Sequence, residues 1–345
     1  MLEQLATAGK NLTIAVEGQT LRLANLDKVL WPAVGEQRAL TKLDLLVYLA
    51  SVSPWLLPHL KDRPVTLTRF PNGIEGKFFY QKHYEDAPDF VQRIRAWSGT
   101  NVRDQTYLLC NNLGTLLWLG QVADLALHTS LARVSPEPDG HDHGLDFTGS
   151  REQVEASLLN YPDFVLFDLD PYIYAGDEGA GAEPELNRRA WLQACEIAHW
   201  LKELLDSASL SSFVKTSGAT GLHIYVPIVR NVDYATVRSI CETFASFLVR
   251  AHPQEITVEW AIPKREGKVF MDVNQNARFK NLATAYSPRA KPGAPVSMPV
   301  RWDELDSVYP TDFNILNAVE RIERVGDPWA HILEAKHDLG AMLGA

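Results

Sequence analysis

Two aspartates one residue apart, Asp168 and Asp170, are the side chains in this sequence best suited to chemistry. They end an apolar run, Phe164 to Phe167, that is typical of a buried strand, and Pro171 stops it. Because side chains alternate along a strand, both carboxylates should share one face while Leu169 faces the core. Such close carboxylates repel each other unless a cation or a proton lies between them. Hard divalent metals bind oxygen ligands of this kind, and two-metal sites support phosphoryl transfer.

An Asp-x-Asp pair at a strand end also occurs in ordinary turns, so alone it leaves a structural role open. Two later segments favour metal binding. Asp272 is the one acid in the core of the apolar run 268–273, where burial without a partner is costly, and a metal shared with the first two acids would remove that cost. Strands predicted at 212–215 and 222–226 enclose the loop 216–221, whose hydroxyls and glycines suit phosphate binding through backbone N–H groups.

The composition describes an ordinary globular protein, with 345 residues, 46% of them hydrophobic and 22% charged. A net charge of −10 argues against a protein that coats nucleic acid through bulk charge. Segment 264–291 nevertheless has seven basic residues against two acids, which suits either phosphate binding or a solvated surface strip. Three isolated cysteines are expected as buried thiols in a reducing cytosol. We expect no signal peptide and no run long and apolar enough to span a bilayer.

Capping residues and apolar spacing predict the helices. Thr41 and Asp44 form a capping box at the start of one helix, and Asp233 caps another. Helices are also predicted over 112–127, ending before His128, and over 185–206. The Gly- and acid-rich segment 175–185 is predicted to be a loop.

Two further segments allow alternative interpretations. In loop 136–144, His141 and His143 lie near acids, but one flexible segment would supply every ligand, so a solvated loop is favoured over a metal site. Phe78 and Phe79, with Lys77, Lys82 and Arg69 in the surrounding sequence, suit base stacking beside phosphate contacts, or else are core aromatics. If they lie on a strand, one of the two rings must point away from the core.

These pieces, in this order, resemble the archaeo-eukaryotic primase superfamily, and more narrowly the polymerase domain of the bacterial end-joining ligase (ligase D) and its stand-alone primase-polymerase relatives. The resemblance spans about residues 21–305 and rests on four motifs: Phe167 to Pro171, Thr216 to His223, Val269 to Asn276 and Ala285 to Ala290. It implies an α/β (α+β) fold with a central mixed or antiparallel sheet flanked by helices. It also implies one domain, with a part that binds DNA ends and 5'-phosphates (1–130), a catalytic part (131–305) and a helical tail (306–345).

The resemblance also implies residue roles. Two divalent ions, Mn²⁺ in preference to Mg²⁺, would be held by Asp168, Asp170 and Asp272. The incoming nucleotide would contact His128, Ser217, Thr220, His223, Arg265, Lys280 and Arg289. DNA would contact Phe78, Phe79 and Arg69, and the 5'-phosphate beyond a gap would contact Asn25, Lys28 and Lys42. The family usually has a lysine in the Ser-Gly-x-Lys-Gly loop where this chain has Thr220, so one triphosphate contact is absent.

The activity implied is that of a DNA-directed polymerase that prefers ribonucleotides and fills short gaps or extends ends in DNA repair. Its partners would be NTPs or dNTPs, DNA with gaps, recessed ends or 5'-phosphates, and a separate ATP-dependent ligase, in the bacterial cytoplasm at the nucleoid. The sequence shows no ligase or nuclease motif, so we expect a stand-alone polymerase without a membrane partner.

Two alternatives remain open at this stage. A manganese-dependent glycosyltransferase would use the Asp-x-Asp pair. That interpretation assigns no role to Asp272, the basic segment or the paired phenylalanines. A DNA-end binding module that has lost catalysis would need none of the three acids, and all three are present.

Overall fold

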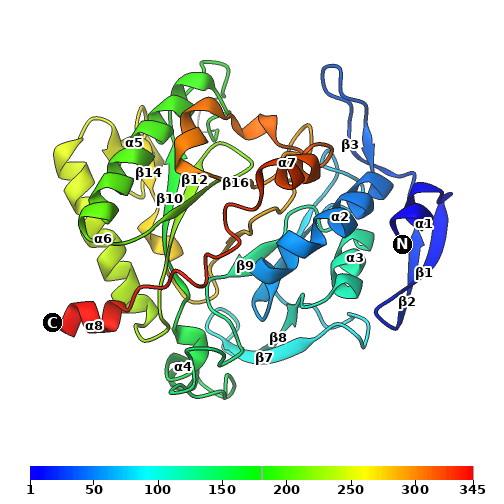
Figure 1. Ribbon diagram of the computed structural model, residues 1–345, viewed down its shortest axis with the longest axis horizontal. Helices are drawn as coiled ribbons and strands as arrows, with labels where there is room; N and C mark the ends of the chain where they lie inside the picture. The colour runs from blue at the N-terminus through cyan, green and yellow to red at the C-terminus, as the bar shows by residue number, and fades with distance from the viewer. Residues whose placement is uncertain (180–181, 345) are drawn as a thin grey trace.

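The computed structural model describes residues 1–179 and 182–344 and arranges the strands mainly in two six-stranded sheets (Figure 1). The first, which we call the catalytic sheet, has the order β13-β14-β10-β12-β11-β16. Its pairs are antiparallel except β13 with β14, so the sheet is mixed, as expected. Its strands are β10 (Phe164–Pro171), β11 (Phe213–Thr216), β12 (Leu222–Pro227), β13 (Ile256–Thr257), β14 (Val269–Met271) and β16 (Pro299–Val300).

Two long helices, α5 (Arg188–Ser207) and α6 (Tyr234–Ala251), pack against β10 and against each other (Figure 1). Their inward positions are apolar, for example Ala194, Leu201 and Val237, which are all fully buried. The strand they support is equally apolar from Phe164 to Phe167. The catalytic sheet is therefore a rigid platform on which polar side chains can be placed at the strand ends.

The second sheet, which we call the N-terminal sheet, has the order β15-β9-β5-β8-β7, with β6 paired to β5. Its strands are β5 (Pro64–Arg69), β6 (Phe79–Gln81), β7 (Arg93–Ser98), β8 (Arg103–Leu109), β9 (His128–Ser130) and β15 (Asn281–Ala283). Because β15 follows β14 in the chain but pairs with β9, the second sheet takes its edge strand from the catalytic part of the sequence. This crossing brings His128 toward the catalytic sheet.

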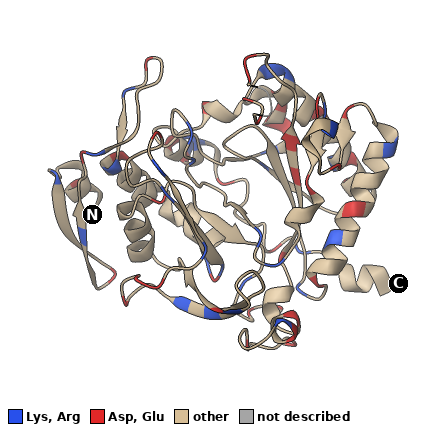
Figure 2. Cartoon of the chain, turned by 180° about the vertical axis from the view of Figure 1, so that it is seen from behind, with Lys and Arg blue, Asp and Glu red and all other residues tan. Residues whose placement is uncertain are grey.

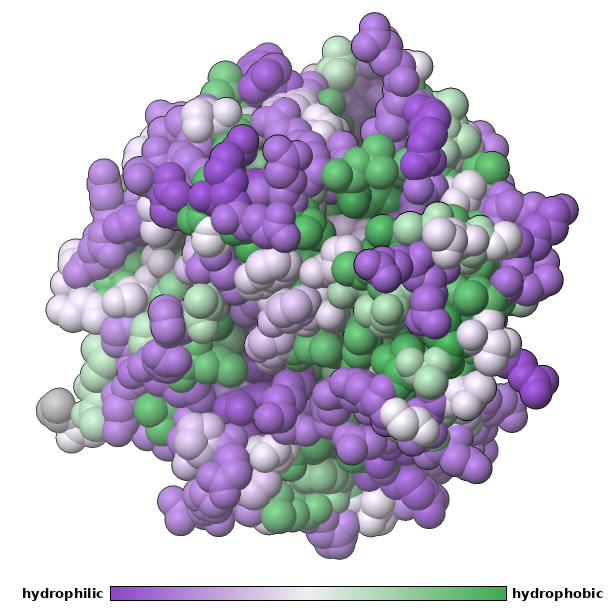
Figure 3. Space-filling model, turned by 45° about the vertical axis from the view of Figure 1, so that its right-hand side comes forward, coloured by the Kyte–Doolittle hydropathy of each residue, from purple (hydrophilic) through white to green (hydrophobic). Residues whose placement is uncertain are grey.

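The other described elements surround these sheets. They are α1 (Leu2–Ala6), β1 (Asn11–Val16), β2 (Gln19–Ala24), β3 (Val29–Trp31), β4 (Leu40–Thr41), α2 (Lys42–Leu60), α3 (Leu113–Gln121), α4 (Arg151–Glu155), α7 (Ala318–Val325) and α8 (Leu339–Gly344). Short 3-10 helices are η1 (Leu158–Asn160), η2 (Ile262–Lys264), η3 (Val273–Gln275), η4 (Trp302–Ser307) and η5 (Pro310–Asp312). Charges of both signs are spread along the chain (Figure 2), and polar residues interrupt the apolar patches of the face in Figure 3.

The predicted capping residues are confirmed: Thr41 and Asp44 form a reciprocal capping box on α2, and Asp233 caps α6. The helix predicted over 112–127 was too long, because α3 ends at Gln121 and the chain then turns toward β9. The helix predicted from 185 begins at Arg188, where Asn187 caps it. The predicted loop 175–185 includes residues 180 and 181, which lie outside the described residues. All three cysteines are free, buried thiols, as predicted.

The expectation that no run is long and apolar enough for a bilayer was wrong for α2, whose 19 residues meet both conditions. Within the described residues it is the one such helix. Half of that apolar stretch is buried inside the protein, where α2 packs on α3, and Pro54 and Pro58 interrupt it. These contacts make α2 a core helix in this fold.

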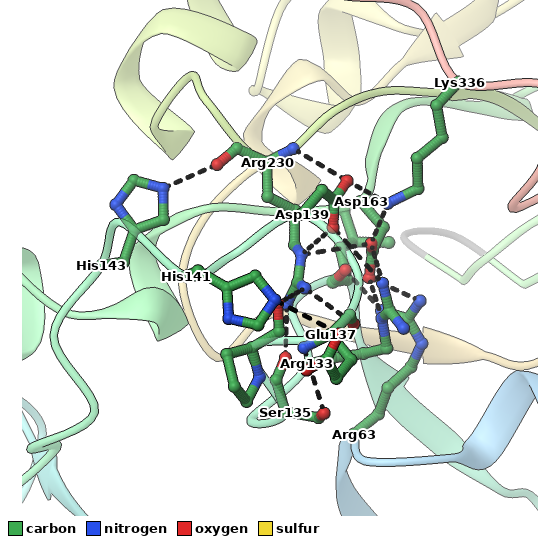
Figure 4. Close-up of polar contacts among 12 residues, drawn as sticks. Arg63, Arg133, Ser135, Glu137, Asp139, His141, His143, Asp163, Arg230 and Lys336 are labelled. Carbon is green, nitrogen blue, oxygen red and sulfur yellow. Dashed lines mark hydrogen bonds and ion pairs between the residues drawn. The ribbon is translucent and has the colours of Figure 1, made fainter.

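A buried ion network anchors the start of β10 (Figure 4). Asp163 is fully buried and accepts hydrogen bonds from Arg63 (2.8 Å), Arg133 (2.8 Å to each carboxylate oxygen) and Lys336 (2.9 Å). A fourth cation, Arg230, lies 3.7 Å away and pairs with Asp139 at 2.8 Å. Segments far apart in sequence therefore meet at one carboxylate.

Loop 136–144 belongs to this network, so its prediction as a solvated loop was wrong for two of its residues. Asp139 accepts hydrogen bonds from Arg230 (2.8 Å) and Lys336 (2.6 Å). The His143 ring donates to the Arg230 carbonyl at 2.7 Å and stacks on Tyr161. His141 contacts only Glu137 and is exposed. The sequence could not show this, since Arg230 and Lys336 lie about 90 and 200 residues downstream.

We expect Asp163→Ala to lower the free energy of unfolding by about 3–5 kcal/mol, because removing one partner of a buried ion pair leaves the other charges uncompensated. Burial alone would raise the pKa of Asp163, but Arg63 and Arg133 hold this pKa well below its ordinary value of 3.8. The stabilisation from the ionised carboxylate is therefore present above about pH 4 and is lost as the pH falls below it. Urea unfolding between pH 3 and pH 7 measures both effects. Lys202→Ala, which breaks the exposed contact with Asp206, is the control, and an equal loss in both variants would contradict the prediction.

Candidate active site

Asp168 and Asp170 lie at the end of β10 and project from the same side, as the alternation predicted, while Leu169 between them is fully buried. The register explains their setting: Asp168 is opposite His223 on β12, and Asp170 is opposite Phe270 on β14. Neighbouring strands on both sides therefore fix the backbone of the pair. The carboxylates line a cavity of about 210 Å³ at the edge of the catalytic sheet.

Asp272 follows β14 directly and is brought beside the pair by the backbone, since its N–H donates to the Asp168 carbonyl at 2.9 Å. Its carboxylate caps η3, accepting hydrogen bonds from the Asn274 N–H (3.0 Å) and from the Gln275 amide (3.0 Å). Across residues 1–179 and 182–344, no three His, Cys, Asp or Glu side chains already stand as a metal-binding group. The structure thus brings the Asp272 backbone beside the other two predicted ligands, while its carboxylate is held by its own turn and is not among the residues that line the cavity.

The charges of these acids are poorly compensated. Burial and repulsion from Asp272 raise the pKa of Asp168 to about 7. Burial, Asp168 and Asp272 raise the pKa of Asp170 well above its ordinary value. One oxygen of Asp168, Oδ1, is buried without a hydrogen bond, although His223 Nε2 approaches it to 3.2 Å. An orphaned carboxylate oxygen among repelling acids is a donor set that suits a hard divalent cation.

The loop 217–221 faces the acids and is folded around one hydroxyl. Ser217 Oγ accepts hydrogen bonds from the N–H groups of Ala219 (3.1 Å) and Gly221 (3.0 Å). Gly218 has φ +68°, a left-handed conformation that favours glycine. Gly221 lies so close to β10 that a Cβ there would be 2.2 Å from the Leu169 carbonyl oxygen. The loop is therefore a tight fit against the strand that carries the acids.

A row of titratable side chains crosses the sheet beside this loop, and the sequence analysis missed one member. Lys215, His223 and Asp168 are register partners on β11, β12 and β10. Lys215 is fully buried and its Nζ lies 2.8 Å from His223 Nδ1 and 2.5 Å from Ser297 Oγ. Burial and the positive charge of Arg289 lower the pKa of Lys215 well below its ordinary value. A lysine within an apolar strand was the available signal, but only the register shows what it contacts.

Arg289 and His128 close the cavity from the other side. The Arg289 guanidinium donates to the Ser217 carbonyl, so it also holds the loop. Burial and Arg289 lower the pKa of His128 to about 3, which keeps the imidazole neutral. Its Nδ1 lies 2.8 Å from the Ala126 carbonyl and so carries the proton, which leaves Nε2 as an acceptor. Of the predicted site residues, the cavity gathers Asp168, Asp170, Ser217, Thr220, His223, Arg289 and His128.

Two predicted nucleotide contacts lie outside this cavity. Arg265 is buried under aromatic rings, with its guanidinium 3.6 Å from the centre of the Phe270 ring. It donates to the Tyr172 hydroxyl (2.9 Å) and to the carbonyls of Glu259 and Trp260. Lys280 is exposed and faces a second cavity next to the first. The structure therefore does not bring Arg265 to the other nucleotide residues.

The aromatic residues before and in β6 form an exposed surface. Phe78, Phe79 and Tyr80 are 56%, 43% and 52% exposed, respectively. Phe78 precedes β6, so the alternation expected if both phenylalanines lay on a strand does not apply to the pair, and its ring stacks on Phe70 at 5.4 Å. Arg69 lies behind them and bonds Gln81 at 3.0 Å. Three exposed rings in sequence make a platform suited to stacking on bases.

The predicted phosphate residues cluster at the start of α2. Burial lowers the pKa of Lys42, and the positive charge of the nearby Lys28 lowers it further. Lys42 Nζ donates to the carbonyls of Ala24 (3.2 Å) and Gln121 (3.0 Å), and Lys28 Nζ donates to Asn72 (2.8 Å). Asn25 adopts φ +55° in the connection between β2 and β3. Two lysines beside a helix N-terminus favour an anion there.

Acids at a strand end that face a serine- and glycine-containing loop and an arginine accompany, in this chain, a match to a nucleotidyltransferase of the polymerase class. Residues 41–329 match the model of the LigD primase-polymerase domain, and the chain belongs to that family. Members of this family are metal-dependent enzymes. The archaeo-eukaryotic primase resemblance and the mixed helix-and-sheet fold are thereby confirmed, and the glycosyltransferase alternative is not supported.

Several relatives are bacterial end-joining proteins. The chain is 30% identical over 312 residues to the bifunctional non-homologous end joining protein LigD of Bacillus subtilis, covering 90% of this chain and 43% of that protein. It is 31% identical to the multifunctional LigD of Mycolicibacterium smegmatis, covering 90% and 35%. The chain therefore spans less than half the length of these relatives. Among solved structures, the polymerase domain of Mycobacterium tuberculosis ligase D, determined in complex with DNA, matches with a TM-score of 0.75 and 28% identity, over 92% of this chain and 99% of that one.

Proposed function

We propose that this protein adds nucleotides, with ribonucleotides preferred, to a DNA 3'-end at a short gap or recessed end bearing a 5'-phosphate. The observation that carries the proposal is the single cavity in which Asp168 and Asp170 face the Ser217 loop and Arg289. The geometry suits a triphosphate placed between carboxylates that hold cations and donors that hold phosphate oxygens. When bound, two divalent ions, with Mn²⁺ preferred over Mg²⁺, would neutralise the triphosphate and activate the 3'-hydroxyl.

The chain's own residues would position the reactants. Asp168, Asp170 and Asp272 would hold the cations, the last after its carboxylate turns from the η3 cap. Arg289 and neutral His223, together with Thr220, would contact phosphate oxygens, and His128 Nε2 would accept a hydrogen bond from a sugar hydroxyl. An acceptor placed at the 2'-position of the sugar would provide a physical basis for preferring a ribonucleotide, because a deoxyribonucleotide has no hydroxyl there to donate. Lys280 would add positive charge that helps to neutralise the triphosphate. Arg265 would do the same once it is released from its aromatic contacts.

The repair role rests on the relatives, whose names place them in non-homologous end joining. We propose the same setting here, with gap filling followed by sealing by an ATP-dependent ligase, at the nucleoid in the bacterial cytoplasm. The polymerase domain solved with DNA supports DNA as the substrate. Phe78 and Phe79 would stack on the template and incoming bases, with Arg69 behind them.

Primer extension on a gapped template tests this function, with Mn²⁺ compared with Mg²⁺ and NTPs with dNTPs. We expect template-directed extension that requires a divalent cation and is fastest with NTPs. A protein that binds the gapped DNA but extends nothing would instead be the non-catalytic DNA-end module. Binding without extension would therefore overturn the proposal.

We expect the 5'-phosphate of a gap to strengthen binding through Lys28 and Lys42, which lie beside the positive end of α2. Lys28→Ala should lower affinity for the phosphorylated gap by on the order of tenfold and leave the unphosphorylated gap unchanged, since a charge-assisted hydrogen bond contributes about 1.5–3 kcal/mol. Fluorescence anisotropy with the two gapped duplexes measures the difference. Lys10→Ala, at an exposed lysine paired with Asp27, is the control. Equal affinity of the wild-type protein for both gaps would defeat this assignment.

A further inference from the structure

A third cavity, of about 370 Å³, has no role so far and shares none of its lining residues with the catalytic cavity. Its walls come from the C-terminal half of α2 and from the segment that follows α7. Prolines, aromatic rings and one acid are among the residues that line it: Pro54, Trp55, Pro58, His59, Asp327 and Trp329. Within residues 1–179 and 182–344, no lysine or arginine lines this cavity, so the phosphates of DNA would find no counter-charge there.

The acid of this third cavity has one oxygen to spare. Asp327 is half-buried, and its Oδ1 accepts hydrogen bonds from the Tyr286 hydroxyl and from the Trp329 N–H, the latter at 2.8 Å. Its Oδ2 forms neither a hydrogen bond nor an ion pair in the part of the chain that the structure describes. Burial raises the pKa of Asp327, because its hydrogen bonds offset the cost of the buried charge only in part. The carboxylate therefore offers a free acceptor that a cation would stabilise.

The rings of the same cavity attract a cation and add no positive charge of their own. Trp55 is half-buried, and the His59 and Trp329 rings lie 5.8 Å apart at an angle of 74°. Burial, together with the positive charges of Arg63 and Lys215, lowers the pKa of His59 to about 3, so its imidazole stays neutral. The face of an aromatic ring is electron-rich and attracts arginine or lysine head groups. Rings and a carboxylate thus favour the same kind of ligand.

We propose that this third cavity binds an arginine side chain of a partner protein, with the guanidinium on Asp327 Oδ2 and against the Trp55 ring. A planar guanidinium can stack on a ring while it donates to a carboxylate, and it is more weakly hydrated than the ammonium of lysine. Pro54 and Pro58 give its methylene groups an apolar surface. The volume lies at the lower end of the range for small-ligand pockets, which suits one side chain rather than a folded segment.

Fluorine NMR of the protein labelled with fluorotryptophan tests this site, with the peptide acetyl-Gly-Arg-Gly-amide as the probe. We expect the signals of Trp55 and Trp329 to shift with a Kd on the order of 1 mM, since a single side chain makes few contacts. The exposed Trp260, outside the cavity, should give an unchanged signal. The same peptide with citrulline keeps the shape of arginine without its charge and should bind on the order of tenfold more weakly.

Two variants separate the charge from the ring. Asp327→Asn keeps an oxygen for the Tyr286 and Trp329 hydrogen bonds and removes the charge, so it should weaken the arginine peptide by on the order of tenfold and leave the citrulline peptide unchanged. Trp55→Leu keeps apolar bulk without a ring and should also weaken the arginine peptide, as read from the Trp329 signal. Asp306→Asn is the matched control, because its exposed carboxylate contacts only His199 outside the cavity, and it should change nothing.

Equal shifts with the arginine and citrulline peptides overturn the proposal, as does wild-type-like binding by folded Asp327→Asn. If Asp327→Asn does not fold, the comparison of the two peptides on the wild-type protein still decides. A Trp55 shift that Asp306→Asn weakens as much as Asp327→Asn does would reflect general attraction to a chain of net charge −10 and would also overturn it. None of these measurements uses primer extension, so their failure leaves the polymerase proposal intact, and a protein that extends nothing could still bind the peptide.

Discussion

Asp168→Asn is expected to reduce primer extension by on the order of a thousandfold while the protein becomes no less stable. Removing one preorganised electrostatic group from an active site commonly costs 10²–10³ in rate, and here the removed group is also one of the three proposed cation ligands. The substitution is isosteric and removes one of three mutually repelling buried acids, so without divalent ions it relieves repulsion. Steady-state extension with Mn²⁺, and thermal unfolding in a chelator, provide the two measurements.

Asp306→Asn is the matched control, because its carboxylate is exposed and contacts only His199. We expect it to leave both measurements unchanged. Asp272→Asn should reproduce the loss of extension if its carboxylate turns into the site. Retained extension in folded Asp168→Asn would remove this carboxylate from the catalytic machinery, whereas loss of folding in the same variant would show that its charge is structural.

Among the glycines of the catalytic part, we expect Gly221→Ala to cause the largest loss of stability and activity. Its Cβ would lie 2.2 Å from the Leu169 carbonyl oxygen and 3.1 Å from Asp170 Oδ1, so β10 and the loop must separate. The separation would break the two bonds between Ser217 and Gly221, from Ser217 N to Gly221 O (2.9 Å) and from Gly221 N to Ser217 Oγ (3.0 Å). We expect about 1–3 kcal/mol of lost stability and about a hundredfold loss of extension, because small misplacements of reacting groups are costly.

The control for this methyl group is Gly9→Ala, where a Cβ meets nothing within 4 Å and the backbone is not left-handed. Urea unfolding and extension assays on both variants should show an effect only at position 221. An active, fully stable Gly221→Ala variant would mean that the loop does not need to press against the catalytic strand.

Local signals explain what could be predicted from the sequence. The Asp-x-Asp strand, the Thr41 capping box and the Asp233 cap each depend on residues within a few positions, and the structure contains all three. The three acids were linked by the cost of burying Asp272 in an apolar run and then by the family resemblance, not by spacing, since Asp272 lies about a hundred residues after Asp170. The family and its polymerase class are confirmed by the comparisons, and the roles of individual site residues stay predictions.

Contacts made through strand register could not be predicted in this way. Lys215 meets His223, which lies opposite Asp168, only because three strands align in one row, and a shift of one residue would turn the lysine to the other face. The Arg265 guanidinium lies over the Phe270 ring, a contact that composition does not reveal. The second cavity combines Lys82 and Phe279, which are separated by 197 positions. The contacts that were not predicted therefore depend on strand register or on tertiary folding, even where the two residues, such as Lys215 and His223, are only 8 positions apart.

The cations that surround Asp163 also set an order of events during synthesis. Arg63 and Arg133 leave the ribosome before the aspartate, Arg230 follows, and Lys336 comes last. A growing chain therefore carries the catalytic strand for more than 170 residues of translation before its last counter-charge is made. Until Lys336 emerges, the ion network at the start of the catalytic strand is incomplete. Chaperones that bind unfolded chains would have that interval in which to act.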